Sequence, residues 1–360
     1  MHVGMATIFQ NPQQRYTDYQ VYRDELRLVD QAELLGYQSI WGVEHHFTDY
    51  TMCPDVIQFL SYMAGRTQRI QLGSAVVVLP WHDPLRVAEE VSMLDHLSNG
   101  RTILGIGRGL ARVEYQGFRL NMAESRARFV ESAQCLLSGL EQGYCEYDGQ
   151  FIQQPRRDIR PKPFRSFQGR TYAAAISPES SQVMAELGVG MLIIPQKPWE
   201  EVANDLQRYR EVFRHVNGQE APLPIAVCWT FCHQDEEQAY QVARRYIGGY
   251  WESVMDHYEF KMDHLKDIPG YEYYGKFTEK IVQYGDEKVI DFFVNLQVWG
   301  TPEQCYQKIL DIRRWTGNDH YIGVFSYAGM PYETAEQNMA LFAREVLPEL
   351  RHLQPEAAQV

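Results

Sequence analysis

The sequence predicts an α/β protein that folds as a (β/α)8 TIM barrel, and three observations support this prediction. Short runs of β-forming composition alternate with longer stretches of helical period, which is typical of βα units around a parallel sheet. Eight such runs can be distinguished. The 360 residues suit one barrel with insertions, and no internal repeat or linker divides them, so we expect one domain over 1–360. The alternative is a doubly wound open sheet.

The first half of the barrel is expected to contain four strands and three helices with clear boundaries. Aliphatic residues gather in four short runs, at residues 3–8, 38–43, 70–79 and 101–106. Helical periodicity appears between them, at residues 19–35, 54–66 and 84–97. Gly36 stands where the first helix is expected to end. Pro84 is expected to begin the third helix, and Asn99-Gly100 is expected to end it.

The second half begins with a long helix at residues 122–139. The stretch that follows, about 141–170, has little helical period and contains three prolines and three glycines. We expect an excursion from the barrel there, with a short hairpin around Asp148-Gly149. The other four strands are expected at residues 171–175, 191–194, 223–231 and 321–325. The other helices are expected at residues 179–187, 199–215, 235–258 and 333–350.

A second irregular stretch, about 260–300, follows the helix after the seventh strand. It ends before Thr301-Pro302-Glu303, which has the pattern of a capped helix start. The two stretches account for the length beyond a minimal barrel and place excursions after strands four and seven. Because long loops in this fold often cover the site, we expect the second stretch to be a lid.

Charge and composition exclude several classes of function. The chain carries 34 Lys and Arg against 47 Asp and Glu, a net charge of −13, which offers no basic surface for nucleic acid or for anionic membranes. No apolar run approaches the roughly 20 residues of a membrane span, and the N-terminus lacks a secretory signal pattern. The six cysteines form neither a C-x-x-C pair nor a dense framework. We therefore expect a cytoplasmic protein with reduced thiols and no nucleic-acid or membrane partner.

A histidine pair follows the second strand, at the end of the barrel where active sites lie. Side chains alternate along a strand, so His45 is expected to face away from Glu44 and His46. An imidazole in this place can exchange protons near neutral pH. The alternatives are a histidine that only completes local hydrogen bonds, and a metal site, for which no further converging ligands are evident.

Residues after strands four and five suit an anion. The segment GIGRGL places three glycines around Arg108, which allows close approach of a ligand and a forked contact to phosphate, although it is not the G-x-G-x-x-G fingerprint. The segment AAAISPESS places Ser177, Ser180 and Ser181 at a helix start. A sharp turn with a solvated arginine and simple helix capping are the alternatives. Together with Arg126, these residues predict a pocket for a cofactor phosphate.

Small residues near the strand ends are a further departure from an ordinary barrel core, which bulky aliphatic residues usually fill. They are Ala6, Ala75 and the run 173–175. These alanines could leave space for a planar ring, or they could be ordinary small-residue packing.

These segments, in this order, resemble the bacterial luciferase family of flavin-dependent monooxygenases, and its alpha-chain type most closely. The resemblance spans nearly the whole chain and rests on EHHFTDY, GSAVVVLPWHDPLRVAEE, LDHLSNGRTILGIGRGL, ESRARF, GYCEYDGQ, WGTPEQC and the serine-rich turn. It implies non-covalent FMN, no metal, His45 as the catalytic residue, and a cis peptide bond between Ala75 and Val76 beneath the flavin ring. The residues implied to contact the cofactor are Ala75, Val76, Arg108, Arg126, Ala175, Ser177, Ser180 and Ser181.

The sequence departs from the alpha-chain pattern near the implied site. Gly107 stands where those chains have a reactive cysteine, and Ile176 stands where they have an acidic residue. Pro195 and Tyr250 replace aromatic residues near the aldehyde pocket. A long-chain aldehyde substrate and light emission are therefore not implied.

The implied activity is transfer of an oxygen atom from O2 to a small organic substrate, by way of a flavin hydroperoxide, with FMN reduced by a separate flavin reductase. The resemblance also implies a homodimer. Two alternatives share the fold: a deazaflavin-dependent hydride-transfer enzyme and a non-catalytic flavin-binding subunit. A metal hydrolase that uses His45 and His46 is the third.

Overall fold

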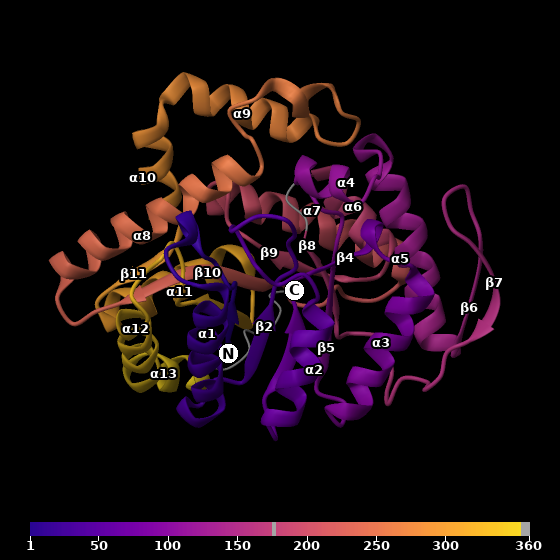
Figure 1. Ribbon diagram of the computed structural model, residues 1–360, viewed down its shortest axis with the longest axis horizontal. Helices are drawn as coiled ribbons and strands as arrows, with labels where there is room; N and C mark the ends of the chain where they lie inside the picture. The colour runs from indigo at the N-terminus through magenta and orange to yellow at the C-terminus, as the bar shows by residue number, and fades with distance from the viewer. Residues whose placement is uncertain (175–177, 354–360) are drawn as a thin grey trace.

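Eight parallel strands close into a barrel. The computed structural model describes residues 1–174 and 178–353, whose arrangement Figure 1 shows. Around the barrel the strands are β1 (His2–Thr7), β2 (Ser39–Gly42), β3 (Gln71–Ser74), β5 (Thr102–Gly107), β8 (Thr171–Ala174), β9 (Gly190–Ile193), β10 (Ile225–Cys232) and β12 (His320–Val324). Each strand pairs in parallel with the next, and β12 pairs with β1, so the sheet closes on itself. The predicted (β/α)8 TIM barrel is confirmed.

A ring of helices surrounds the strands. Its members are α1 (Asp18–Leu35), α2 (Val56–Arg66), α3 (Pro84–Leu97), α5 (Ser125–Gln142), α6 (Pro178–Glu186), α7 (Trp199–Asn217), α11 (Pro302–Thr316) and α12 (Tyr332–Glu345), which α13 (Leu347–His352) follows. The position after strand seven is taken by α11, which contacts both α7 and α12. The helix directly after that strand, α8 (Glu236–His257), extends away from the ring and contacts the second excursion (Figure 1).

Local sequence signals bound these helices as expected. At the start of α1, the Thr17 side chain accepts a hydrogen bond from the backbone N–H of Gln20, and Gly36 ends the helix with a left-handed φ of 94°. Thr301 and Gln304 form a capping box at the start of α11. The helix start predicted from Thr301-Pro302-Glu303 is thus confirmed.

The third strand is shorter than predicted. β3 ends at Ser74, and β4 (Val77–Val78) pairs separately with β5 before the 3-10 turn η2 (Leu79–Trp81). A cis peptide bond joins Ala75 to Val76 between the two segments. The cis bond that the family resemblance implied is confirmed, and the continuous strand expected over 70–79 is corrected to two short ones.

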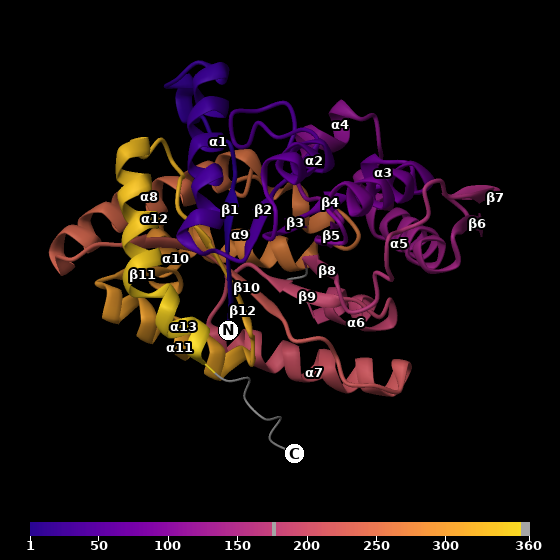
Figure 2. The same ribbon diagram turned by 90° about the horizontal axis from the view of Figure 1, so that it is seen from below.

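The first excursion is a hairpin at the periphery. β6 (Tyr144–Asp148) pairs antiparallel with β7 (Gln153–Asp158), as the Asp148-Gly149 turn predicted. The Glu131 carboxylate on α5 accepts hydrogen bonds from the backbone N–H groups of residues 150–152, at 3.1, 2.7 and 2.9 Å. Both views place the hairpin beside α5, away from the end of the barrel that α9 covers (Figures 1 and 2).

The second excursion is helical, which corrects the irregular stretch expected over 260–300. It contains η4 (Asp263–Asp267), α9 (Glu272–Tyr284), α10 (Asp286–Leu296) and β11 (Val298–Gly300), which extends the sheet beside β10. The two helices are short and meet at Gly285, whose φ of 79° breaks the helical period that would have revealed them. In Figure 1 α9 lies above the barrel, and in Figure 2 it lies behind the strands, so α9 covers one end of the barrel.

A tryptophan fills the middle of the barrel. Trp41 on β2 is fully buried, and its indole N–H donates to Ser39 Oγ at 2.8 Å. Gly73 on β3 must be small, because a Cβ there would lie 2.3 Å from the Trp41 ring. This packing fills part of the interior, and ligands in this fold bind at the C-terminal ends of the strands.

The loops at those strand ends carry short elements of their own. They are η1 (Pro12–Gln14) after β1, and α4 (Arg112–Gly117) and η3 (Met122–Glu124) after β5. All six cysteines lie in the described part of the chain, where they are buried and free of disulfide bonds. Among the described residues, we find no helix with both the length and the apolar character to cross a bilayer.

Candidate active site

A cleft opens at the C-terminal ends of the strands and brings together most of the predicted site residues. It has an empty volume of about 1100 Å³, which includes solvent at its mouth. The predicted residues that line it are His45, Ala75, Val76, Arg108, Arg126 and Ser180. Tyr258, just after α8, and Tyr274 from the second excursion line it as well, so that excursion lies where a lid was expected. No residue of the hairpin excursion is among the described lining residues.

Of the other three predicted residues, only Ser181 lies in the described part of the chain. Ala175 and Ser177 lie outside the described residues. Ser181 is buried and lines a separate, smaller pocket with Met191 and Ile193. That placement does not favour Ser181 as a contact for a ligand in the main cleft.

The two adjacent histidines have different partners, as the alternation of side chains predicted. His45 Nδ1 lies 2.9 Å from Glu114 Oε1, and its Nε2 lies 3.4 Å from the Tyr258 hydroxyl. His46 Nε2 instead lies 3.0 Å from Glu44 Oε1. His45 therefore joins the cleft to a buried carboxylate, whereas His46 belongs to a separate network.

Glu114 is the central residue that the sequence prediction missed. It lies on α4 with a fully buried side chain, and it also accepts a hydrogen bond from the backbone N–H of His46 at 2.9 Å. Burial by itself would raise the pKa of this carboxyl, but His45 and His257 outweigh burial and lower the pKa to about 2. One sequence signal was available: Glu114 is the only acidic residue between Asp95 and Glu124.

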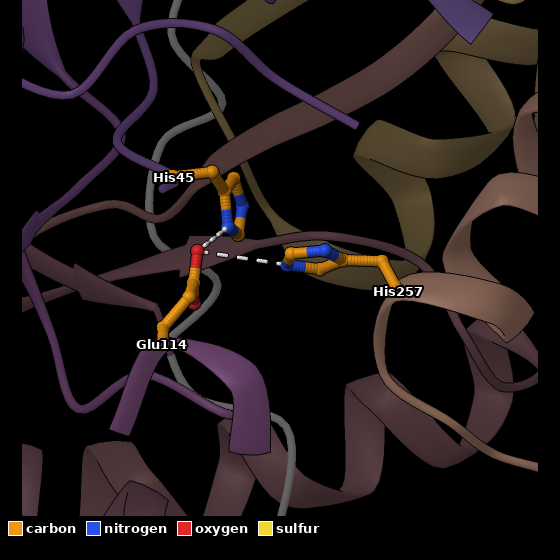
Figure 3. A group of neighbouring side chains, drawn as sticks. All are labelled: His45, Glu114 and His257. Carbon is orange, nitrogen blue, oxygen red and sulfur yellow. Dashed lines mark hydrogen bonds and ion pairs between the residues drawn. The ribbon is translucent and has the colours of Figure 1, made fainter. Parts of the chain in front are cut away.

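His257 completes the group from the far side. It is the last residue of α8, and its Nε2 lies 3.5 Å from Glu114 Oε1 (Figure 3). Its Nδ1 lies 3.0 Å from Thr48 Oγ1, and its ring stacks on Tyr50 with centroids 4.3 Å apart. Burial lowers the pKa of His257 below its usual value. No sequence pattern links His257 to His45, because they are 212 residues apart and meet only through the fold of α8.

A second carboxylate network supports the wall of the cleft. Glu44 Oε1 contacts His46 Nε2 at 3.0 Å and His82 Nε2 at 2.6 Å, and its Oε2 accepts from the backbone N–H of Val78 at 2.9 Å. Burial raises the pKa of Glu44, but these hydrogen bonds outweigh burial, so the net shift is downward. An ionised Glu44 therefore holds β4 and the adjoining Val76 in place.

The two predicted phosphate-binding arginines converge on one oxygen atom of the second excursion. Arg108 Nη1 donates to the carbonyl oxygen of Gly270 at 2.9 Å, and Arg126 Nη2 donates to the same oxygen at 3.4 Å. The Arg108 guanidinium lies 4.0 Å from the centre of the Tyr271 ring, and the Tyr271 hydroxyl donates to Gly109 O at 2.9 Å. The lid segment thus rests on the groups that were predicted to hold an anion.

Comparison with known proteins identifies the family of this chain. A family model described as luciferase-like monooxygenase matches residues 1–319. The alkanal monooxygenase alpha chain of Photorhabdus laumondii is 25% identical over 350 residues, which cover 96% of each chain. The monooxygenase RslO1 from Streptomyces bottropensis has a TM-score of 0.80 and 25% identity, over 97% of this chain and 99% of that one.

Two further solved structures share the fold at lower identity. The oxygenating constituent of 3,6-diketocamphane monooxygenase from Pseudomonas putida, solved with FMN, has a TM-score of 0.71 and 16% identity over 97% and 98% of the chains. The coenzyme F420-dependent tetrahydromethanopterin reductase from Methanopyrus kandleri has a TM-score of 0.65 and 18% identity over 97% and 99%. Those two show the fold alone, whereas the family match spans most of the sequence. This chain belongs to the family of luciferase-like monooxygenases.

Proposed function

We propose that this protein is a monooxygenase that uses reduced FMN and O2 to oxygenate a small organic substrate. The observation that carries the proposal is one cleft lined both by Arg108 and Arg126 and by His45 with its buried carboxylate partner. A cofactor with an anionic tail and a reactive ring requires both kinds of group. Membership of the luciferase-like family supports the same assignment.

The cationic part of the cleft suits the phosphate of non-covalently bound FMN. Arg108 and Arg126 already donate to a single acceptor, the Gly270 carbonyl, so a phosphate oxygen would meet the same two donors. Ser180 adds a hydroxyl near the start of α6. Ser177 is proposed as a further phosphate contact from the family resemblance.

The small-residue wall of the cleft suits the flavin ring. Ala75, Val76 and Ala174 line it together with Gly107 and Gly109, so a flat ligand would meet only small residues on this wall. Apolar and aromatic residues complete the lining and would keep water from the reacting atoms. They are Trp81, Leu110, Phe129, Leu192 and Tyr274. Ala175 is proposed as a further ring contact from the resemblance.

Bound reduced FMN supplies the two electrons with which O2 is cleaved, one oxygen atom passing to the substrate and the other leaving as water. The role of the protein's own residues is to hold and transfer a proton. The hydrogen bond to Glu114 favours the tautomer of neutral His45 that has its proton on Nδ1 and its lone pair on Nε2. Nε2 lies beside the Tyr258 hydroxyl in the cleft, where it can accept a proton and return it.

Two partners follow from the same family resemblance. We propose that a separate flavin reductase delivers the reduced cofactor and that the protein acts as a homodimer of single-domain chains. Co-purification with a reductase is not required for the test below, because FMN can be reduced chemically.

The test replaces His45 with Ala and supplies chemically reduced FMN, O2 and candidate substrates. We expect product formation to fall by about 10²-fold or more, the usual contribution of a general acid–base group, while the Kd for FMN stays within two-fold. Tyr258→Phe keeps the ring, removes the hydroxyl beside His45 and should cause a smaller loss. Unchanged product formation in His45→Ala would falsify the catalytic role of His45. Hydride transfer with F420, without O2 consumption from reduced FMN, would indicate the deazaflavin activity instead.

A further inference from the structure

We propose that His45, Glu114 and His257 form a binding site for a divalent transition-metal ion such as Zn²⁺. Each residue offers one donor atom, and the three atoms lie within 4.8 Å of one another. They come from the loop after β2, from α4 and from the end of α8, so the fold alone assembles them (Figure 3). Two imidazoles with one carboxylate form a known ligand set for zinc.

The distances between the donor atoms are near those around a tetrahedral ion. Zinc bonds of roughly 2.0–2.2 Å place neighbouring ligand atoms about 3.4 Å apart. His45 Nδ1 lies 2.9 Å from Glu114 Oε1, and His257 Nε2 lies 3.5 Å from the same oxygen, values on either side of that separation. The two imidazole nitrogens lie within 4.8 Å of each other, so small side-chain rotations would close the triangle.

Each ligand has an outer partner that orients it. His257 Nδ1 lies 3.0 Å from Thr48 Oγ1, and His45 Nε2 lies 3.4 Å from the Tyr258 hydroxyl. The backbone N–H of His46 donates to Glu114 Oε1 at 2.9 Å. Metal-binding histidines and carboxylates usually have such partners, which fix the ring orientation and the tautomer.

Two buried polar atoms of the group make no hydrogen bond in the described part of the chain, and a bound cation would interact with them. Within the described part of the chain, Glu114 Oε2 and His257 Nε2 are buried and make no hydrogen bond, although Nε2 approaches Oε1 to 3.5 Å. The neighbouring cation Arg112 is bound to Glu259, with Nε 2.8 Å from Oε2. A fully buried carboxylate between two imidazoles therefore attracts a compact dication.

The cleft lies on one side of the site. His45 is among the described lining residues of the cleft and Glu114 and His257 are not, so an ion would enter past the His45 ring and would complete its coordination with water. Imidazole ligands favour zinc, copper and nickel over magnesium and calcium. The two histidine ligands of the proposed site are His45 and His257. The sequence offered His46 as the second ligand, but its side chain contacts Glu44 instead.

Binding would also act on the proposed reaction, and this consequence alone rests on the proposed function. An ion on His45 Nδ1 forces the ring proton onto Nε2, where the lone pair is then lost. His45 can no longer accept a proton from the cleft, so we expect Zn²⁺ to inhibit oxygenation reversibly.

Calorimetric titration of the metal-free protein with Zn²⁺, in the absence of flavin, tests the site. We expect one Zn²⁺ per chain, with binding at least ten-fold weaker in His257→Gln and in Glu114→Gln. His46→Gln and the exposed-surface variant His215→Gln should bind as the wild type does. Co²⁺ should produce visible absorption bands in the wild type that His257→Gln lacks. Equal binding by wild type and His257→Gln, or a matching loss in His215→Gln, would overturn the site.

A second variant tests the site even if His257→Gln does not fold. Thr48→Val keeps the size of the side chain but removes the oxygen 3.0 Å from His257 Nδ1, and should weaken Zn²⁺ binding by about ten-fold. Circular dichroism checks the fold of every variant. If His257→Gln is not folded, wild-type affinity in Thr48→Val overturns the proposal. Because no flavin is present, failure here leaves the proposed oxygenation intact.

Discussion

Gly107 shows at the scale of one residue how closely the wall of the cleft is packed. A Cβ at this position would lie 2.4 Å from Cγ2 of Val76, well inside contact distance. The Val76 methyl group thus occupies the space that a side chain at 107 would need. The cysteine implied by the alpha-chain pattern could not be accommodated here without displacing the wall of the cleft.

Gly107→Ala is expected to destabilise the protein by about 1–3 kcal/mol, the usual cost of overpacking, as measured by denaturant unfolding. Val76→Ala in the same chain should restore most of the loss, because it removes the methyl group that the new Cβ meets. Gly65→Ala on α2 is the matched control: nothing lies within 4 Å of a Cβ there, so it should stabilise by roughly 0.5–1 kcal/mol. Equal effects of the two alanine substitutions would contradict the packing argument.

The site also shows which residues a sequence can reveal. His45, Arg108 and Ser180 were found because each follows a strand, and strand ends of one barrel meet at one face. Glu114 and His257 were missed because they lie on helices, where periodicity describes which face is buried and not what that face contacts.

At the scale of elements, the second excursion is joined to the site by an ion pair. Glu259, just after α8, accepts from Arg112 on α4, with Nε 2.8 Å from Oε2 and Nη2 2.5 Å from Oε1. The same segment places the Gly270 carbonyl on the two arginines of the cleft. The excursion is therefore held at two points over the cleft, which suits a cover that can open.

Glu259→Gln should loosen this cover. The pair is partly exposed, so its loss costs about 1 kcal/mol at most, and hydrogen exchange in residues 258–296 should accelerate up to about five-fold. Glu220→Gln removes a similar two-bond pair with Arg214 on the outer helix α7 and should leave that exchange unchanged. Exchange mass spectrometry compares them, and the same result for both variants would mean that the Arg112 pair does not hold the cover.

At the scale of the whole molecule, one buried carboxyl couples stability to pH. Glu25 on α1 accepts hydrogen bonds from Thr7 on β1 and from Ser326 after β12, so it joins the two strands at the closure of the barrel to their covering helix. Burial raises the pKa of Glu25 to about 7, although these hydrogen bonds oppose the shift.

The raised pKa means that the folded state binds the proton more tightly than the unfolded state. The contribution of Glu25 to the free energy of unfolding is complete below pH 4.5 and is lost as pH rises through about 7. For a pKa raised from 4.5 to about 7, this contribution is about 3 kcal/mol. Glu25→Gln, which stays neutral, should lack this part of the pH dependence. Unfolding free energies of both proteins from pH 5 to pH 8 provide the measurement, and parallel curves would contradict the assignment.

The sequence by itself determined the barrel, the order and approximate bounds of its strands, the peripheral hairpin and the family. Those features depend on local periodicity, on turn and cap residues, and on segments that recur in a fixed order. The tertiary structure decided that residues 260–300 form two helices over the cleft and that α11 takes the ring position after strand seven. Only the tertiary structure brings Glu114 and His257 to His45. Contacts between residues far apart in the chain depend on how helices pack, and local sequence patterns do not record that packing.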